Sequence, residues 1–130
     1  MKPLSNITLL ALLFISLPSS AYTLNEKLDY CAKIESWAPW KVISALSSKD
    51  KGLDIGNATS VLINRVALKE NNKNITLGAW GDLYVQTIKI TIPYVNNKMQ
   101  PKIIITSSII SPEECSLSEP SYLDVTELNK

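Results

Sequence analysis

The sequence predicts a small, mainly β domain of the sandwich type, with a short helix near its N-terminus and one disulfide. Short runs rich in Val, Ile and Thr recur through the second half of the chain at the spacing of short strands. The middle runs carry apolar residues on both alternating faces, as two packed sheets require. Two cysteines lie near opposite ends of the chain and can close it covalently.

The helix is predicted from about Leu24 to Ser36. Thr23 can cap it, because its hydroxyl can accept a hydrogen bond from the Glu26 amide. Apolar residues then recur at helical spacing and place Cys31 on the buried side. The stretch from Trp40 to Ser48 fits either a strand or a further helical segment, and its apolar spacing slightly favours the helix.

The predicted strands are bounded by turn-forming residues. The clearest strand alternates apolar residues on one face with Thr87, Lys89 and Thr91 on the other. No internal repeat or linker interrupts the chain, so residues 22–130 are expected to form one domain. The strand segments are Thr59 to Leu68, Leu83 to Tyr94, Lys102 to Ile110, and Tyr122 to Thr126.

Residues 1–21 are predicted to be a cleaved secretory signal peptide. Lys2 supplies the positive start, an apolar run follows from Ile7 to Leu17, and small residues end at Ala21. The alternative is a membrane anchor, but a span needs roughly 20 apolar residues and this run is shorter. Cleavage would leave a chain that starts at Tyr22. We therefore expect an exported protein, secreted or periplasmic, without a membrane-inserted segment.

The two cysteines are predicted to form a structural disulfide. In an exported protein an even number of cysteines indicates a bond, and two cysteines allow one intramolecular pair, Cys31 with Cys115. A catalytic dithiol would place its cysteines close together in the sequence, as in C-x-x-C. The separation of this pair favours a staple over a redox centre.

The charge balance argues against two classes of partner. The chain has 13 Lys and Arg against 12 Asp and Glu, and the lysines are spread along it. Nucleic-acid-binding proteins gather a basic excess on one surface, and anionic membranes attract basic clusters. Neither nucleic acid nor an anionic membrane is therefore expected as a partner.

The composition also disfavours most catalytic mechanisms. The chain has no histidine, which removes Ser-His-Asp and Cys-His systems as well as histidine-containing zinc sites. The adjacent pair Glu113 and Glu114 is interpreted as a solvated loop, and the segment from Asp50 to Asp54 has too few oxygens in register for calcium. A catalytic Ser–Lys dyad is possible in principle, but nothing in the sequence distinguishes one serine and lysine as such a pair. We expect no enzyme activity, no catalytic residues, no cofactor and no metal.

Three aromatic residues are the candidates for contact with a partner: Trp40, Trp80 and Tyr84. Tryptophan is frequent at binding hot spots because it buries a large area with few rotors. It is also frequent in β-sandwich cores, and the core interpretation is favoured for Trp37. For Trp40 and Trp80 the two interpretations are about equal. Trp80 lies between Gly78 and Gly81, which predicts a tight, exposed turn.

The layout resembles the interleukin receptor mimetic protein A family of small exported proteins from Gram-negative bacteria. The resemblance rests on the leader, the length of the remaining chain, the pair Cys31 and Cys115, and the β-rich segment Gly78-Ala79-Trp80-Gly81-Asp82-Leu83-Tyr84-Val85. It implies an immunoglobulin- or fibronectin type III-like sandwich, a homodimer made by segment exchange, and binding to host cytokines in virulence. The segment from Trp37 to Trp40 lacks the serines of the cytokine-receptor W-S-x-W-S box, so that role is not carried over.

Two functional hypotheses follow. The first is a secreted binding protein, a cytokine-receptor mimic that binds host interleukins. The second is a periplasmic inhibitor or immunity protein that blocks a toxin or a cell-wall-lytic enzyme. Both require a rigid, non-catalytic scaffold that binds another protein.

Overall fold

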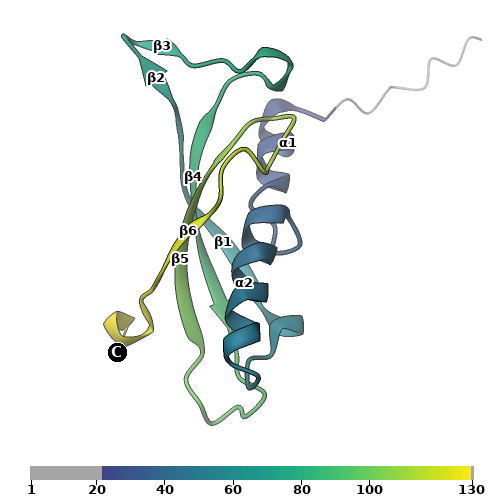
Figure 1. Cartoon of the computed structure of the whole chain (residues 1–130), viewed down its shortest axis with the longest axis vertical. Coiled ribbons are helices and arrows are strands. Elements are labelled where there is room, and N and C mark those ends of the chain that lie inside the picture. The colour runs from purple at the N-terminus through teal and green to yellow at the C-terminus, as the bar shows by residue number, and fades with distance from the viewer. Residues whose placement is uncertain (1–21, 130) are drawn as a thin grey trace, which may run out of the picture.

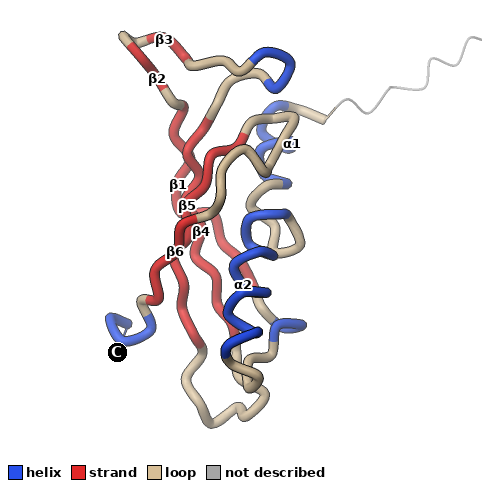
Figure 2. The backbone as a smooth tube through the Cα atoms, in the orientation of Figure 1, coloured by secondary structure: helices blue, strands red, loops and turns tan. Residues whose placement is uncertain are grey.

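The computed structural model describes residues 22–129, and the predicted signal peptide lies outside them. A four-stranded antiparallel sheet carries two helices laid end to end along one face, and a two-stranded ribbon projects from one end (Figure 1). The helices are α1 (Leu24–Tyr30) and α2 (Trp37–Lys49); the strands are β1 (Thr59–Ala67), β2 (Lys69–Glu70), β3 (Lys73–Asn74), β4 (Tyr84–Ile92), β5 (Lys102–Ile110) and β6 (Ser121–Asp124). Short 3-10 turns are η1 (Ile55–Asn57), η2 (Gly78–Trp80) and η3 (Thr126–Asn129) (Figure 2).

The first helix begins as predicted and ends early. The Thr23 hydroxyl accepts a hydrogen bond from the Glu26 amide at 3.2 Å. The helix then ends at Tyr30 instead of continuing to Ser36. The Ser36 hydroxyl lies 2.7 Å from the carbonyl oxygens of both Cys31 and Lys33, and such side-chain bonds compete with the helical pattern. The predicted helix is therefore too long, because a serine satisfies the backbone in a turn.

The second helix confirms the helical alternative for the stretch from Trp40 to Ser48. It begins at Trp37, so it also includes Pro39. Proline is tolerated in the first turn of a helix because the amides there have no partner within the helix. Ser36 is the N-cap residue of this helix and separates it from α1.

The main sheet has the strand order β1-β4-β5-β6, and every neighbouring pair is antiparallel. The predicted bounds of β5 are confirmed to the residue, and β1 ends one residue earlier than predicted. In the ribbon, Asn71 and Asn72 have φ values of 51° and 63°. Positive φ at both central residues is what a tight two-residue hairpin turn requires, and asparagine tolerates it. The polar segment between β1 and β4 is thus a small hairpin rather than a plain loop.

The core lies between the helices and one face of the sheet. Val42 and Ile43 of α2 pack against alternate residues of the two central strands: Ile88, Ile90, Ile92 and Ile104, all at most 1% exposed. A smaller cluster joins Leu28 and Cys31 of the α1 region to Ile110 of β5. The predicted alternation of β4 is confirmed, because its isoleucines face the helices while Lys89 is exposed.

The fold class is confirmed in its broad form. The protein is mainly β, with an N-terminal helix and a disulfide between Cys31 and Cys115. Within residues 22–129 the second layer consists of helices, and the remaining strands form only the small β2–β3 ribbon. A two-sheet sandwich of the immunoglobulin or fibronectin type III kind is not confirmed by this arrangement.

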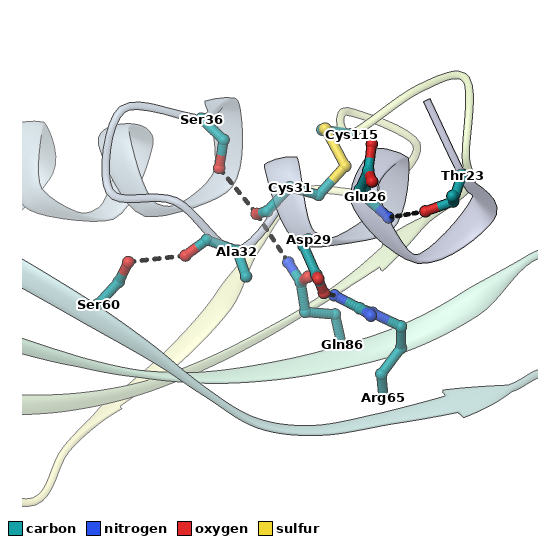
Figure 3. Close-up of polar contacts among 10 residues, drawn as sticks. All are labelled: Thr23, Glu26, Asp29, Cys31, Ala32, Ser36, Ser60, Arg65, Gln86 and Cys115. Carbon is teal, nitrogen blue, oxygen red and sulfur yellow. Dashed lines mark hydrogen bonds and ion pairs between the residues drawn. A yellow bond between two sulfur atoms is a disulfide. The ribbon is translucent and has the colours of Figure 1, made fainter. Parts of the chain in front are cut away.

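Cys31 is the point at which three parts of the chain meet (Figure 3). Its sulfur bonds that of Cys115, and the Cα atoms of the two residues are 5.3 Å apart. Its carbonyl oxygen accepts hydrogen bonds from the Ser36 hydroxyl at 2.7 Å and from the Gln86 side-chain amide at 2.9 Å. Gln86 belongs to β4 and is fully buried. Gln86 therefore fixes the helical layer to the sheet, the disulfide fixes it to the loop after β5, and Ser36 links α1 to α2 within the layer.

The C-terminal strand is held by polar contacts at its end. The Lys102 ammonium lies 3.0 Å from the Asp124 carboxylate, which also accepts from the Thr126 backbone amide and lies within bonding distance of its hydroxyl. Desolvation, the largest effect, raises the pKa of Asp124, but the bonds from Thr126 and Lys102 together outweigh it and lower the pKa. The bond to Asp124 in turn raises the pKa of Lys102, although desolvation opposes it. The ionised pair stabilises the β5–β6 edge.

Removing the disulfide should destabilise the protein strongly. The cysteines are 84 residues apart, and closing a loop of that length is worth about 4–5 kcal/mol through the entropy of the unfolded chain. We expect the Cys31→Ala/Cys115→Ala protein to lose most of this free energy of unfolding, measured by urea denaturation with tryptophan fluorescence. Wild-type protein in reductant is the matched control and should unfold at a similar urea concentration. A midpoint unchanged in both samples would contradict the staple role.

The attachment of β6 should weaken in acid. Because the pKa of Asp124 is lower in the folded protein than its ordinary value of 3.8, its contribution is present above that value and is lost as the pH falls through the folded pKa. We expect amide hydrogen exchange in β6 to accelerate below about pH 4 relative to β4. Asp124→Asn should remove this acid-dependent step. An identical pH profile in the variant would show that other groups control the edge.

Candidate protein-binding surfaces

The three predicted contact residues lie on three different elements. Trp40 is on α2 and is 51% exposed, and Trp80 is in η2 and is 42% exposed. Tyr84, at the start of β4, is half-buried and packs against the cluster around Leu28 and Cys31. Trp40 and Trp80 are thus available at the surface, whereas Tyr84 helps to hold α1 on the sheet.

The turn that carries Trp80 is fixed by the neighbouring ribbon. The Asp82 carboxylate accepts hydrogen bonds from the Thr76 hydroxyl at 2.8 Å and from the Asn74 side-chain amide at 2.9 Å. These two bonds lower the pKa of Asp82, so the carboxylate stays ionised. Gly81 has a φ of 82°, which an L side chain rarely adopts. The predicted tight turn is confirmed, and it presents Trp80 outward.

A hollow in the described surface lies beside α1, and we call it the α1 hollow. It has a volume of about 670 Å³, and its walls include Tyr22, Lys27, Tyr30, Pro112 and Glu113. A second hollow of about 280 Å³ shares four of these residues and adds Trp37 and Cys115 to the lining. The two hollows are therefore neighbours that share part of their walls, one beside α1 and the other at the start of α2.

The loop that closes the α1 hollow is held at several points. The Cys31–Cys115 bond fixes one side, and the Lys27 ammonium pairs with the Glu113 carboxylate at 2.7 Å. Ser111 is fully buried, and its hydroxyl accepts from the backbone amides of Glu113 and Glu114. The hydroxyl and amide of Ser116 both bond Glu114 and lower its pKa. These contacts give the hollow a defined shape before any partner binds.

The α1 hollow combines aromatic rings with charged side chains. Tyr30 is 52% exposed, and the Lys33 ammonium lies 5.8 Å from the centre of its ring. Asp29, on the same helix, forms an ion pair with Arg65 of β1 at 2.9 Å. In the described part of the chain, no three His, Cys, Asp or Glu side chains are grouped so as to hold a metal ion. Aromatic rings beside fixed charges suit a protein partner, because they offer apolar area and directed polar contacts together.

The tryptophans of α2 continue this surface. Trp37 is only half-buried, although the sequence favoured a core position, and the Lys41 ammonium lies over its ring at 4.7 Å from the centre. Lys41 also pairs with Glu119 at 2.6 Å. Trp40 follows Trp37 by three residues, so the two rings lie on neighbouring positions of the helix surface. Trp37 lines the second hollow, and Trp40 adds an exposed ring next to it on α2.

The sheet has a second exposed surface, the face opposite the helices, which we call the open face. Both α1 and α2 lie on the other face of the sheet (Figure 1). Cross-strand partners point to the same face of a sheet, so the register defines rows of side chains across β1, β4 and β5. The upper row is Val66, Val85 and Ile109; the polar row is Asn64, Thr87 and Ser107; the lysine row is Val61, Lys89 and Ile105.

Sequence reasoning missed the α1 hollow because its walls come from distant parts of the chain. Neither Tyr30 nor Glu113 belongs to a sequence motif, and Glu113 was interpreted as a residue of a solvated loop. One signal was present: a disulfide between Cys31 and Cys115 must bring the residues beside each cysteine close together. Tyr30 is adjacent to Cys31, and Pro112 and Glu113 lie within three residues of Cys115; all three line the hollow. Pairing the neighbours of the cysteines would have located the hollow.

No helix in residues 22–129 combines the length and the apolar character needed to cross a membrane. Comparison with protein-family models finds no matching family, and comparisons with curated proteins and with solved structures find no significant match.

Proposed function

We propose that this chain is a non-enzymatic binding protein that acts outside the cytoplasm and recognises another protein through the α1 hollow. The observation that carries this proposal is the aromatic depression fixed by the Cys31–Cys115 bond and the Lys27–Glu113 ion pair. A surface that is shaped before binding loses less conformational entropy when the partner docks. Cofactors and metals have no part in this proposal.

The location outside the cytoplasm is supported by the disulfide. Such bonds persist in oxidising compartments and are rare in the cytosol. The bond here joins two otherwise separate parts of the chain, as expected of a structural bond in an exported domain. The apolar N-terminal segment with Lys2 supports the same destination.

The favoured partner is a host cytokine, in keeping with the resemblance to the interleukin receptor mimetic protein A family. Hot spots of protein interfaces are rich in aromatic residues, and Tyr30 and Trp37 supply such rings next to the Lys33 ammonium. The same resemblance implies a fibronectin type III-like sandwich. To form one, the main sheet of this chain would need a second sheet packed on its open face. A periplasmic inhibitor or immunity protein is the second candidate, since the same rigid depression would suit the surface of a toxin or lytic enzyme.

Truncating the exposed aromatic ring should weaken binding without unfolding the protein. We expect Tyr30→Ala to weaken the affinity by about 30-fold or more, the size of a hot-spot effect, because the ring supplies apolar area in the hollow. The measurement is biolayer interferometry against a panel of host interleukins, and against purified cell-wall-lytic enzymes for the second candidate. Val95→Ala is the matched control, since Val95 is 73% exposed and does not line the α1 hollow.

The outcomes separate the candidates. Binding to an interleukin that Tyr30→Ala abolishes and Val95→Ala preserves would support the first. Inhibition of a lytic enzyme with the same sensitivity would support the second. A partner whose affinity depends on Trp80 but not on Tyr30 would place the binding surface at η2 and overturn the role of the α1 hollow. Fractionation of the producing cells would show whether the chain is retained in the periplasm or released.

A further inference from the structure

The open face has the composition of a surface that is normally covered. Val61, Val66 and Leu123 are 57%, 54% and 63% exposed on it. The central strand β5 carries Ile103, Ile105 and Ile109 on the open face and Ile104 and Ile110 on the helix face. Isoleucine on both faces is typical of a strand buried on both sides, whereas a strand with one solvent-exposed face alternates apolar and polar residues. The helices account for the burial of only one side.

We propose that a second copy of this chain covers the open face, so that two sheets pack face to face and form a sandwich across a two-fold axis. This inference does not rest on the proposed function, because the α1 hollow lies on the helix side of the molecule. No strand is exchanged, and each copy keeps the fold of the single chain.

The row pattern of the open face matches itself under such an axis. If the axis runs along the polar row, Asn64, Thr87 and Ser107 meet their own copies. The Thr87 and Ser107 hydroxyls lie 2.9 Å apart, so they already satisfy each other within one chain. The lysine row then packs on the upper row of the other copy. Val61 meets Val66 and Ile105 meets Ile109, so apolar residues face each other on β1 and β5, while Lys89 of β4 meets Val85 of the other copy.

Lys89 has a place in this arrangement. It is the only charged residue in the three rows, and no ion pair within the described residues involves it. The lysine row is two residues from the axis, so the two Lys89 Cα atoms would be about 17 Å apart, given a rise of about 3.3 Å per residue and sheets about 10 Å apart. This exceeds the Debye length of about 10 Å at moderate salt, which screens their repulsion. Each stem can lie over the end of the other sheet while its ammonium reaches water.

The size of the open face fits a specific dimer. Three nine-residue strands and the short β6, spaced by about 4.8 Å and rising about 3.3 Å per residue, give a flat footprint of roughly 500 Å². The footprints of the two copies therefore sum to about 1,000 Å², without the additional area of the protruding side chains. A total buried area of about 1,000 Å² is the lower bound for specific interfaces. With Lys89 as the only charge in its three rows, the open face also lacks the charge pattern that would select a strongly charged partner.

The test is the oligomeric state of the disulfide-bonded protein, measured by sedimentation equilibrium over a range of concentrations. We expect wild type to dimerise, and Val61→Glu to weaken the dimer at least tenfold by placing a carboxylate against the upper row of the other copy. Val95→Glu is the matched control, because Val95 is exposed but lies outside the open face, and its dimer should match wild type. Val61 is exposed in the single chain, so Val61→Glu should keep the circular dichroism spectrum and urea midpoint of wild type.

Three results would overturn the proposal. If wild type stays monomeric at high micromolar concentration, a second copy does not cover the open face, and its partner would have to be a different protein. A dimer that tolerates both Val61→Glu and Val95→Glu would be formed elsewhere, for example by exchange of a segment. A dimer abolished by Lys89→Ala would mean that Lys89 makes a specific contact, which the axis along the polar row does not provide. None of these results bears on binding at the α1 hollow, so the two proposals fail independently.

Discussion

The architecture depends on the contacts of one residue, Cys31. The α1 helix has only seven residues, and an isolated helix of that length does not persist in water. It is kept in place because the Cys31 side chain is bonded to Cys115 while its carbonyl oxygen accepts from Ser36 and Gln86. The same contacts set where α1 ends, where α2 begins and where the loop around Pro112 lies. The α1 hollow is therefore a consequence of this junction and not of an independent motif.

The contacts around Cys31 leave one buried polar atom without a hydrogen-bond partner among the described residues. Gln86 is fully buried in the sheet, and its side-chain oxygen has no hydrogen-bond partner among the described residues. An unsatisfied buried acceptor costs about 1–3 kcal/mol. The amide group of the same side chain nonetheless makes the only direct side-chain link between β4 and the Cys31 carbonyl oxygen. An apolar residue at this position would remove the penalty and also release the turn that positions α1.

Much of the sheet was predictable because its signal is local. The alternation in β4 and the β-branched run of β5 specify strands without reference to the rest of the chain, and the disulfide followed from a count of two cysteines. The length of α1 was not predictable, because Ser36 ends it through bonds formed in three dimensions. The second layer was not predictable either: apolar residues on both faces of β5 indicate two coverings but do not say that one is helical.

The position of the disulfide also determines when it can form. Cys31 precedes α2, and Cys115 follows β5, so 84 residues separate the two thiols and nearly all of the sheet lies within the loop that they close. Bringing such distant points together before the intervening strands pair would carry the full entropy of a long flexible loop. Oxidation is therefore favoured after the chain has folded, and a nascent or truncated chain that lacks Cys115 can reach no locked state. The covalent bond thus marks the molecules in which the segment after β5 has reached the end of α1, and the thiol titre of a preparation counts the molecules that have not yet been locked in this way.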